Sequence, residues 1–244
     1  MQRCEGLHLE ADRLIIAGTG SKHLPSCVVR LISLFLAMTG ILTEPHIFLQ
    51  QQDSQLGEII QQISLPEIDS SEDVFYDLLT CILEQQIHYR SSGVYLRKFN
   101  ELTDGLWPTA ELVLTLDAHD FALKKIASNK FQRLQVLAQC WIDRGYEQVD
   151  WQQLGDEAIR ARLSDIKGIG PWTVNMILLF TLGRPDIFDP NDYQLKKVMA
   201  SVYGLSPEGR LISEMKEISE KWSPFKSTAV RYLLAWQSLS KKRR

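Results

Sequence analysis

The sequence predicts an all-α protein. From about Ser70 onward, apolar residues recur at intervals of three and four, which is the period of an amphipathic helix. No convincing run of strict apolar and polar alternation interrupts this pattern, so strands are not expected. Hydrophobic residues make up 45% of the 244-residue chain, which is enough to bury one full core or two small lobes.

Each helix is predicted from its apolar period and from the residues that cap or break it. Ser70 with Asp73 forms an N-cap signature for a helix that runs to about residue 88. Ser91 or Ser92 caps the next helix, which ends before Gly105. Further helices are predicted over residues 109–116, 119–126, 130–144, 156–166, 171–182, 193–202, 207–222 and 226–239, and Gly145 is expected to end the third of these.

The first part of the chain differs from the rest. Residues 1–65 are expected to form an irregular or partly helical lead-in, and residues 66–244 the folded core. The apolar stretch from Leu24 to Met38 is far shorter than the roughly 20 residues that span a bilayer, and its setting is poor for an export signal. We expect translation to start at Met38, with residues 1–37 as an upstream extension.

Charge and cysteine content exclude several classes of protein. The formal net charge of −3 argues against binding nucleic acid through bulk basicity, although helix N-termini and loop amides can still hold phosphates. Cys4, Cys27, Cys81 and Cys140 lie too far apart for a zinc or iron–sulfur site, so no metal cluster is expected. Cys81 and Cys140 are interpreted as small core residues of a reduced, intracellular protein.

The most informative segment runs from Leu163 to Phe180. An amphipathic helix is followed by Gly168, Ile169 and Gly170, and then by a proline that suits the first turn of a second helix. Glycine permits positive φ and lets a phosphate approach the backbone, so the free amides of the turn can face an anion. Ile169 is expected to anchor the turn in the core. An ordinary helix–helix turn remains the alternative for this segment alone.

An acidic loop follows this second helix. It contains Asp186, Asp189 and Asp192, and either Asn191 or Asp192 is expected to cap the helix that begins at Tyr193. The dipole and free amides of a helix N-terminus favour the charged form of a carboxylate placed there. Asp192 is therefore interpreted at least as a helix cap. Asp189 and Asp186 are interpreted as surface or loop-structuring residues.

Four segments resemble the helix-hairpin-helix DNA glycosylases, and most of all their bacterial 3-methyladenine DNA glycosylase II branch. IKGIGPWTVNM, residues 166–176, is similar to the family hairpin, with Lys167 in place of the usual proline. FDPNDYQLKK, residues 188–197, is similar to the catalytic loop, whose essential aspartate directly precedes the tyrosine. CILEQQIHYRSS and WSPFKSTAVRYLLAW, residues 81–92 and 222–236, resemble the segment that wedges into DNA and the closing helix. Glu84 and His88 depart from the wedge pattern, and Trp236 lies two positions out of register.

This resemblance implies a two-lobed helical core with the active-site groove between the lobes, and it makes Asp192 the catalytic residue. A fixed anion near C1′ would stabilise the oxocarbenium-like sugar of glycosidic cleavage and could orient the attacking water. Relatives that also nick the backbone carry a Schiff-base lysine where this chain has Trp172, so monofunctional hydrolysis is expected. The Trp172 ring would also stack on a cationic alkylated purine.

The resemblance also implies the remaining site residues and partners. The expected partner is double-stranded DNA with damaged bases, bound by a monomer that acts in the cytoplasm at the nucleoid; no cofactor is expected beyond a monovalent cation at the hairpin. Two alternatives stay open: a glycosylase for another lesion, and a non-catalytic hairpin module in which Asp192 is only a cap. The expected pocket residues are Trp172, Met176, Tyr76 and Trp236, and Met176 stands where a pocket tyrosine is usual. The expected DNA contacts are Gly168, Gly170, Thr173, Lys167 and Gln86. Gln86, or Gln85 as its alternative, is expected to fill the space that the flipped base leaves in the stack.

Overall fold

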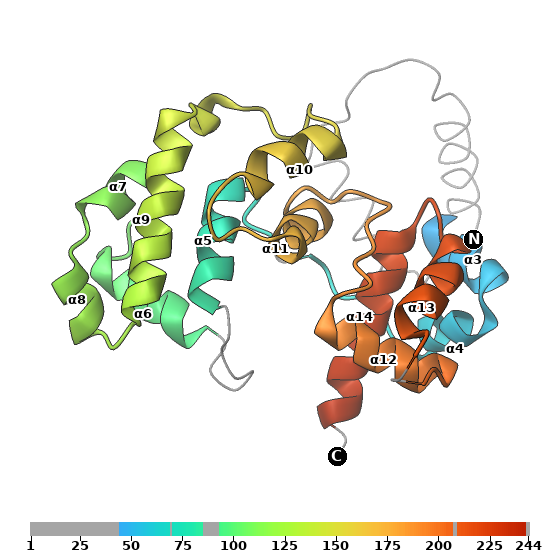
Figure 1. The fold of residues 1–244 in the computed structure, drawn as a ribbon. Helices are drawn as coiled ribbons and strands as arrows, with labels where there is room; N and C mark the ends of the chain where they lie inside the picture. The colour runs from blue at the N-terminus through green and yellow to red at the C-terminus, as the bar shows by residue number, and fades with distance from the viewer. Residues whose placement is uncertain (1–43, 69, 85–92, 207–208, 243–244) are drawn as a thin grey trace, which may run out of the picture. The chain divides into compact units, whose positions relative to one another are not determined.

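The computed structural model describes residues 44–68, 70–84, 93–206 and 209–242 (Figure 1). The chain divides into two units, residues 1–47 and 48–244, and the account below concerns the second. The expected start at Met38, the wedge residues Gln85 and Gln86, and the cysteines Cys4 and Cys27 lie outside the described residues. None of the described helices is long and apolar enough to cross a membrane.

The prediction of an all-α fold is confirmed, since the described residues form helices and contain no strand (Figure 1). In chain order the helices are α3 (Glu44–Gln52), α4 (Ser54–Gln62), α5 (Val74–Glu84), α6 (Val94–Leu102), α7 (Ala110–Thr115), α8 (Ala118–Leu123), α9 (Ser128–Asp143), the 3₁₀ turn η2 (Tyr146–Gln148), α10 (Asp156–Ser164), α11 (Pro171–Met176), the π-helical turn η3 (Ile177–Thr181), α12 (Tyr193–Tyr203), α13 (Leu211–Glu220) and α14 (Lys226–Lys242).

Several predicted helix boundaries differ from the structure by a few residues, and two of these differences have an identifiable reason. Asp73 itself caps α5, because its Oδ1 accepts the Tyr76 amide at 3.1 Å, whereas Ser70 only closes the preceding turn. The helix predicted to reach residue 126 ends at Leu123, because Lys125 adopts a positive φ of 55° that no α-helix accommodates. The predicted stop at Gly145 is confirmed by its left-handed φ of 62°.

The helices pack in two groups. In the first, α5, α7 and α8 pack on α9, while α5 also contacts α6 and η3, and α10 contacts α11. In the second, α12 packs on α13 and α14, and α14 contacts α4. On α9 the buried residues recur at intervals of three and four, so one stripe of this helix is the centre of the first group.

A buried carboxylate holds the second group together. Asp53, only 7% exposed, accepts the Leu56 amide at 3.0 Å through Oδ1 and so caps α4. Its Oδ2 accepts hydrogen bonds from the Tyr203 hydroxyl and from Trp222 Nε1, both at 2.9 Å. Burial and the neighbouring Asp53 charge raise the pKa of the Tyr203 hydroxyl well above its usual value, so it remains a donor. The predicted lead-in thus supplies one of the polar anchors of this group.

Candidate active site

The glycine turn forms the hairpin that the sequence predicts. Gly168 has a φ of 98°, which side-chain-bearing residues rarely adopt, and it is exposed together with Lys167. Ile169 between the glycines is only 5% exposed, so the expectation that it anchors the turn in the core is confirmed. Its amide donates to the Ile166 carbonyl at 3.0 Å, which closes the turn.

The second hairpin helix is shorter than predicted. Pro171 occupies its first turn, as expected, but α-helical geometry ends at Met176 and continues as the π-helical turn η3. Within this turn the Thr181 hydroxyl donates to Asp77 Oδ2 at 2.7 Å, which ties the end of the hairpin helix to α5. A π-turn of this kind accommodates an extra residue in the helix and is often found near functional sites.

Asp192 joins the acidic loop to this hairpin. Its Oδ1 accepts the Leu195 amide at 2.6 Å, which confirms the predicted cap of α12. Its Oδ2 accepts a hydrogen bond from Trp172 Nε1, also at 2.6 Å, and the residue is only 8% exposed. Because Trp172 lies two residues beyond Gly170, the carboxylate is held against the first turn of the second hairpin helix. The structure therefore brings the glycine turn and Asp192 together.

Two exposed aromatic side chains flank this carboxylate. Trp172 is 41% exposed although its indole nitrogen is bonded, and Tyr193 is 63% exposed. Lys197 lies over the Tyr193 ring, with Nζ 4.5 Å from the ring centroid. Sequence reasoning did not include Tyr193 in the site. Its position directly after Asp192 in the sequence was the available signal.

A buried polar network fixes the loop that carries Asp192. Asn175 of α11, 8% exposed, accepts a hydrogen bond from Arg160 of α10 and donates to Asp189 Oδ2 at 3.0 Å. Asp189 Oδ1 in turn accepts the Asn191 amide at 2.9 Å. Both hairpin helices are thereby bonded to the acidic loop. Sequence reasoning missed Asn175 and Arg160, although an amide in an otherwise apolar helix requires partners when buried.

Asp186 and Asp189 take loop-structuring positions, as interpreted from the sequence. Asp186 is exposed and accepts the Ser223 hydroxyl at 2.8 Å and the Lys226 amide at 3.2 Å, which organises the start of α14. Asp189 is buried and bonded to Asn175. Two of the three aspartates therefore contact α11, Asp189 through Asn175 and Asp192 through Trp172.

The other predicted pocket and DNA-contacting residues lie in several different surroundings. Tyr76 stacks on Trp107, with ring centroids 4.3 Å apart and planes 18° apart. Trp236 lines a separate pocket of about 200 Å³ beside α12, which Asp192 does not line. Met176 is half-buried at the end of α11. Thr173 is only 2% exposed as a whole residue, so the structure packs it inside the protein.

Two cations of α9 lie near the hairpin and the end of α5, and sequence reasoning missed both. Arg133 lies beside Gly168, with its Cγ and Cδ 3.7 and 3.8 Å from where a Cβ would stand on that glycine. Lys130 Nζ donates to the carbonyls of Ile82 and Leu83 at 3.2 and 2.6 Å. Burial, with the nearby Arg133 charge, lowers the pKa of Lys130. Their spacing of three on one helix was the available signal of a local basic face.

Comparisons with known proteins agree with this geometry. No protein-family model matches the chain. A Bacillus subtilis protein, YfjP, named provisionally as a DNA-3-methyladenine glycosylase, is 26% identical over 200 residues, covering 80% of this chain and 69% of its own length. DNA-3-methyladenine glycosylase 1 of Schizosaccharomyces pombe is 24% identical, covering 79% of this chain and 86% of its own. The solved S. pombe 3-methyladenine DNA glycosylase in complex with abasic DNA matches with a TM-score of 0.68 at 23% identity, and the match covers 79% of this chain and 95% of that chain.

The helical fold, the glycine hairpin and the capping aspartate beside it define a helix-hairpin-helix DNA glycosylase architecture. The chain is similar in sequence to DNA glycosylases of the 3-methyladenine type, and it shares the fold of the solved S. pombe enzyme. The family prediction made from the sequence is confirmed.

Proposed function

We propose that this protein is a monofunctional DNA glycosylase of base excision repair, which flips an alkylated purine of the 3-methyladenine type out of the duplex and hydrolyses its N-glycosidic bond. One observation carries the proposal: the Asp192 carboxylate is held by the Leu195 amide and the Trp172 indole, directly beside the glycine hairpin. The names of the sequence relatives support the same reaction and lesion type.

Asp192 is suited to act as the fixed anion of the reaction. Two short hydrogen bonds orient its carboxylate before the substrate arrives, so little reorganisation is needed when positive charge develops on the sugar. The same carboxylate can orient the attacking water or accept its proton. An alkylated purine already carries positive charge and is a good leaving group, so the mechanism does not require a strong general acid.

Trp172 distinguishes hydrolysis from lyase chemistry. A lyase needs an amine that forms a Schiff base with the sugar, and an indole cannot do this. Trp172 is 41% exposed, so part of its ring is free to stack on a flipped base. Met176, Tyr76 and Trp236 stay proposals as further pocket residues.

The hairpin is proposed as the clamp for a DNA phosphate. Gly168 and Lys167 are exposed, and helix geometry leaves the amides of Gly170 and Thr173 without intrahelical partners. Arg133 beside Gly168 adds a positive charge there. This local arrangement explains how a chain of net charge −3 can bind duplex DNA. Gln86 is proposed to fill the vacated stack.

The proposed function also concerns metal ions, a cation at the hairpin and the cellular setting. Within the described residues, no group of three His, Cys, Asp or Glu side chains could hold a metal ion. The Ile166 and Gly170 carbonyls accept the Ile169 and Val174 amides at 3.0 and 3.1 Å, and each has a second lone pair. We propose that these carbonyls hold a monovalent cation, which would add positive charge facing a phosphate. A cytoplasmic monomer remains part of the proposal.

A base-release assay tests the proposed function. The purified full chain is incubated with duplex DNA methylated at purines, with matched unmethylated and 8-oxoguanine duplexes, and released bases are separated by chromatography. We expect release of methylated purine from the first duplex alone, and strand breaks only after alkali treatment. Release of the oxidised base alone would favour a glycosylase that acts on oxidised bases. No release from any duplex despite binding would favour a non-catalytic hairpin module, and nicking without alkali would contradict the monofunctional reaction.

A further inference from the structure

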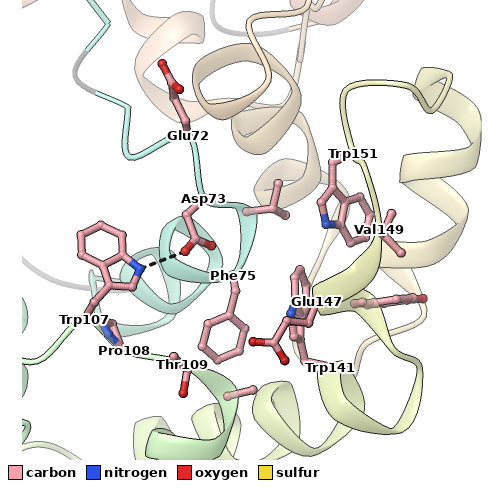
Figure 2. A pocket seen from close by; sticks show the side chains of 13 residues that line it. Glu72, Asp73, Phe75, Trp107, Pro108, Thr109, Trp141, Glu147, Val149 and Trp151 are labelled. Carbon is pink, nitrogen blue, oxygen red and sulfur yellow. Dashed lines mark hydrogen bonds between the residues drawn. The ribbon is translucent and has the colours of Figure 1, made fainter.

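A second pocket lies outside the Asp192 site. It has a volume of about 350 Å³ and lies between the start of α5, the segment before α7 and the region from the end of α9 to residue 151 (Figure 2). Pockets that bind small molecules in proteins usually measure roughly 300–1,000 Å³. Neither Asp192 nor Trp172 lines it. The pocket is therefore large enough for one small ligand that does not occupy the proposed catalytic site.

Indole rings form much of its wall. Trp141 and Trp151 stack on each other with ring centroids 5.4 Å apart and an interplanar angle of 24°. Trp107 stands across from them and is 54% exposed, with its ring supported by Tyr76 (Figure 2). Its Nε1 donates to Asp73 Oδ2 at 3.0 Å, which fixes the orientation of the ring. Flat apolar surfaces held this way favour an aromatic or cationic ligand.

Carboxylates supply the polar part of the lining. Glu72, Asp73 and Glu147 line the pocket, whereas no Lys, Arg or His is found among its thirteen described lining residues. In the described part of the chain, none of the three carboxylates forms an ion pair. Figure 2 shows the Glu147 carboxylate directed into the space bounded by Phe75. Negative charge without a cation makes the pocket unsuitable for a phosphate or another anion.

The pKa of Glu147 reflects the negative charge around it. Desolvation raises the pKa of the Glu147 carboxyl above its usual value, and the charge of Glu111, a hydrogen bond with Glu111 and the charge of Asp73 raise it further. A ligand N–H group that donates to Glu147 would stabilise its carboxylate. A ligand with an apolar ring alone would offer no such bond to Glu147.

We propose that this pocket binds one neutral, amino-substituted nitrogen heterocycle, stacked against the Trp107 ring and donating an N–H hydrogen bond to Glu147. The choice of a free alkylated purine base as its ligand rests on the proposed function, because that reaction would release such a base. The pocket then acts as a second site for the product. Binding there requires no contact with Asp192.

Calorimetric titration of the full chain with free 3-methyladenine tests the proposal. Hypoxanthine serves as a comparison ligand, because it is a purine without an exocyclic amino group. Glu147→Gln removes the charge with little change of shape, and we expect roughly tenfold weaker binding, as for loss of a charged hydrogen bond. Trp107→Ala should also weaken binding, and wild type should bind hypoxanthine more weakly than 3-methyladenine.

Two control variants make the titration decisive. Glu217→Gln removes the same charge from exposed α13, and Asp192→Asn alters the proposed catalytic site; both should bind 3-methyladenine as the wild type does. Equal affinity in Glu147→Gln and wild type, loss of binding in Asp192→Asn, or no binding by wild type would each overturn the proposal. The base-release assay on wild type is run separately. Glu147-dependent binding without any release would leave the pocket assigned and reject the proposed function.

Discussion

Trp172→Phe isolates the hydrogen bond between the indole and the catalytic carboxylate. Phenylalanine keeps an aromatic ring at the site but removes the N–H that donates to Asp192 Oδ2 at 2.6 Å. Asp192 Oδ1 would still accept the Leu195 amide and cap α12. The variant should therefore fold normally, while its carboxylate loses one of two orienting bonds.

The expected magnitude follows from the exposure of the bond. A hydrogen bond to a charged group contributes about 1.5–3 kcal/mol. Trp172 is 41% exposed, so competition with water places this bond at the lower end of that range. A loss of about 1.4 kcal/mol in transition-state stabilisation corresponds to about a tenfold slower step. We expect base release by Trp172→Phe to be roughly ten times slower at saturating enzyme.

Single-turnover kinetics on a methylated duplex measure this effect, and a double-mutant cycle with Asp192→Asn assigns it. Saturating enzyme removes differences in DNA binding, so the rate reports the chemical step together with base flipping. If Trp172 acts through the carboxylate, Trp172→Phe should slow the wild type but leave the residual rate of Asp192→Asn unchanged. A rate within twofold of wild type, or an equal loss in both backgrounds, would refute this positioning role.

Three further predictions concern stability, the hairpin and a thiol. Asp53→Ala should lower the free energy of unfolding by about 3–5 kcal/mol in urea denaturation, because it removes a helix cap and leaves two buried donors unpaired. Asp117→Ala, at an exposed cap, should lower the free energy of unfolding by only about 1 kcal/mol. Equal losses in the two variants would contradict the role of burial. Gly168→Ala should lower the free energy of unfolding by about 1–2 kcal/mol and weaken duplex binding, because φ is 98° there. Gly155→Ala, where φ is negative and a Cβ meets open space, should change neither stability nor duplex binding. Desolvation raises the pKa of Cys81 to about 12, helped by two nearby carboxylates, so mass-mapped alkylation at pH 8 should label it only after unfolding; rapid labelling of the folded chain would contradict this.

Most of the fold could be predicted from the sequence, because local signals determine it. The apolar period sets each helix face, and the cap at Asp192 and the stop at Gly145 are encoded in single residues. The buried Ile169 between two glycines likewise follows from the local pattern. Boundaries were less accurate where a backbone conformation at one residue, such as Lys125, ended a helix early.

The candidate site could be predicted only in part, because its geometry depends on contacts between distant residues. The spacing of Trp172 and Asp192 indicated two separate roles, but not the hydrogen bond that joins them. Asn175 and Arg160 come from two helices, and their bond to each other is a tertiary contact that no periodicity reveals. The aromatic pocket at Glu147 likewise assembles residues from three segments of the chain.

The rate of Asp192→Asn compared with Asp186→Asn tests the central claim most directly. Asparagine is a good helix cap, so thermal unfolding should show α12 intact in the first variant. Asp186 lies in the same loop, and its hydrogen-bond partners among the described residues are Ser223 and Lys226. We predict base release from methylated duplex slowed by roughly 10²–10³-fold or more in Asp192→Asn, with duplex binding retained, and release near the wild-type rate in Asp186→Asn. An undiminished rate in a folded Asp192→Asn protein would contradict the account.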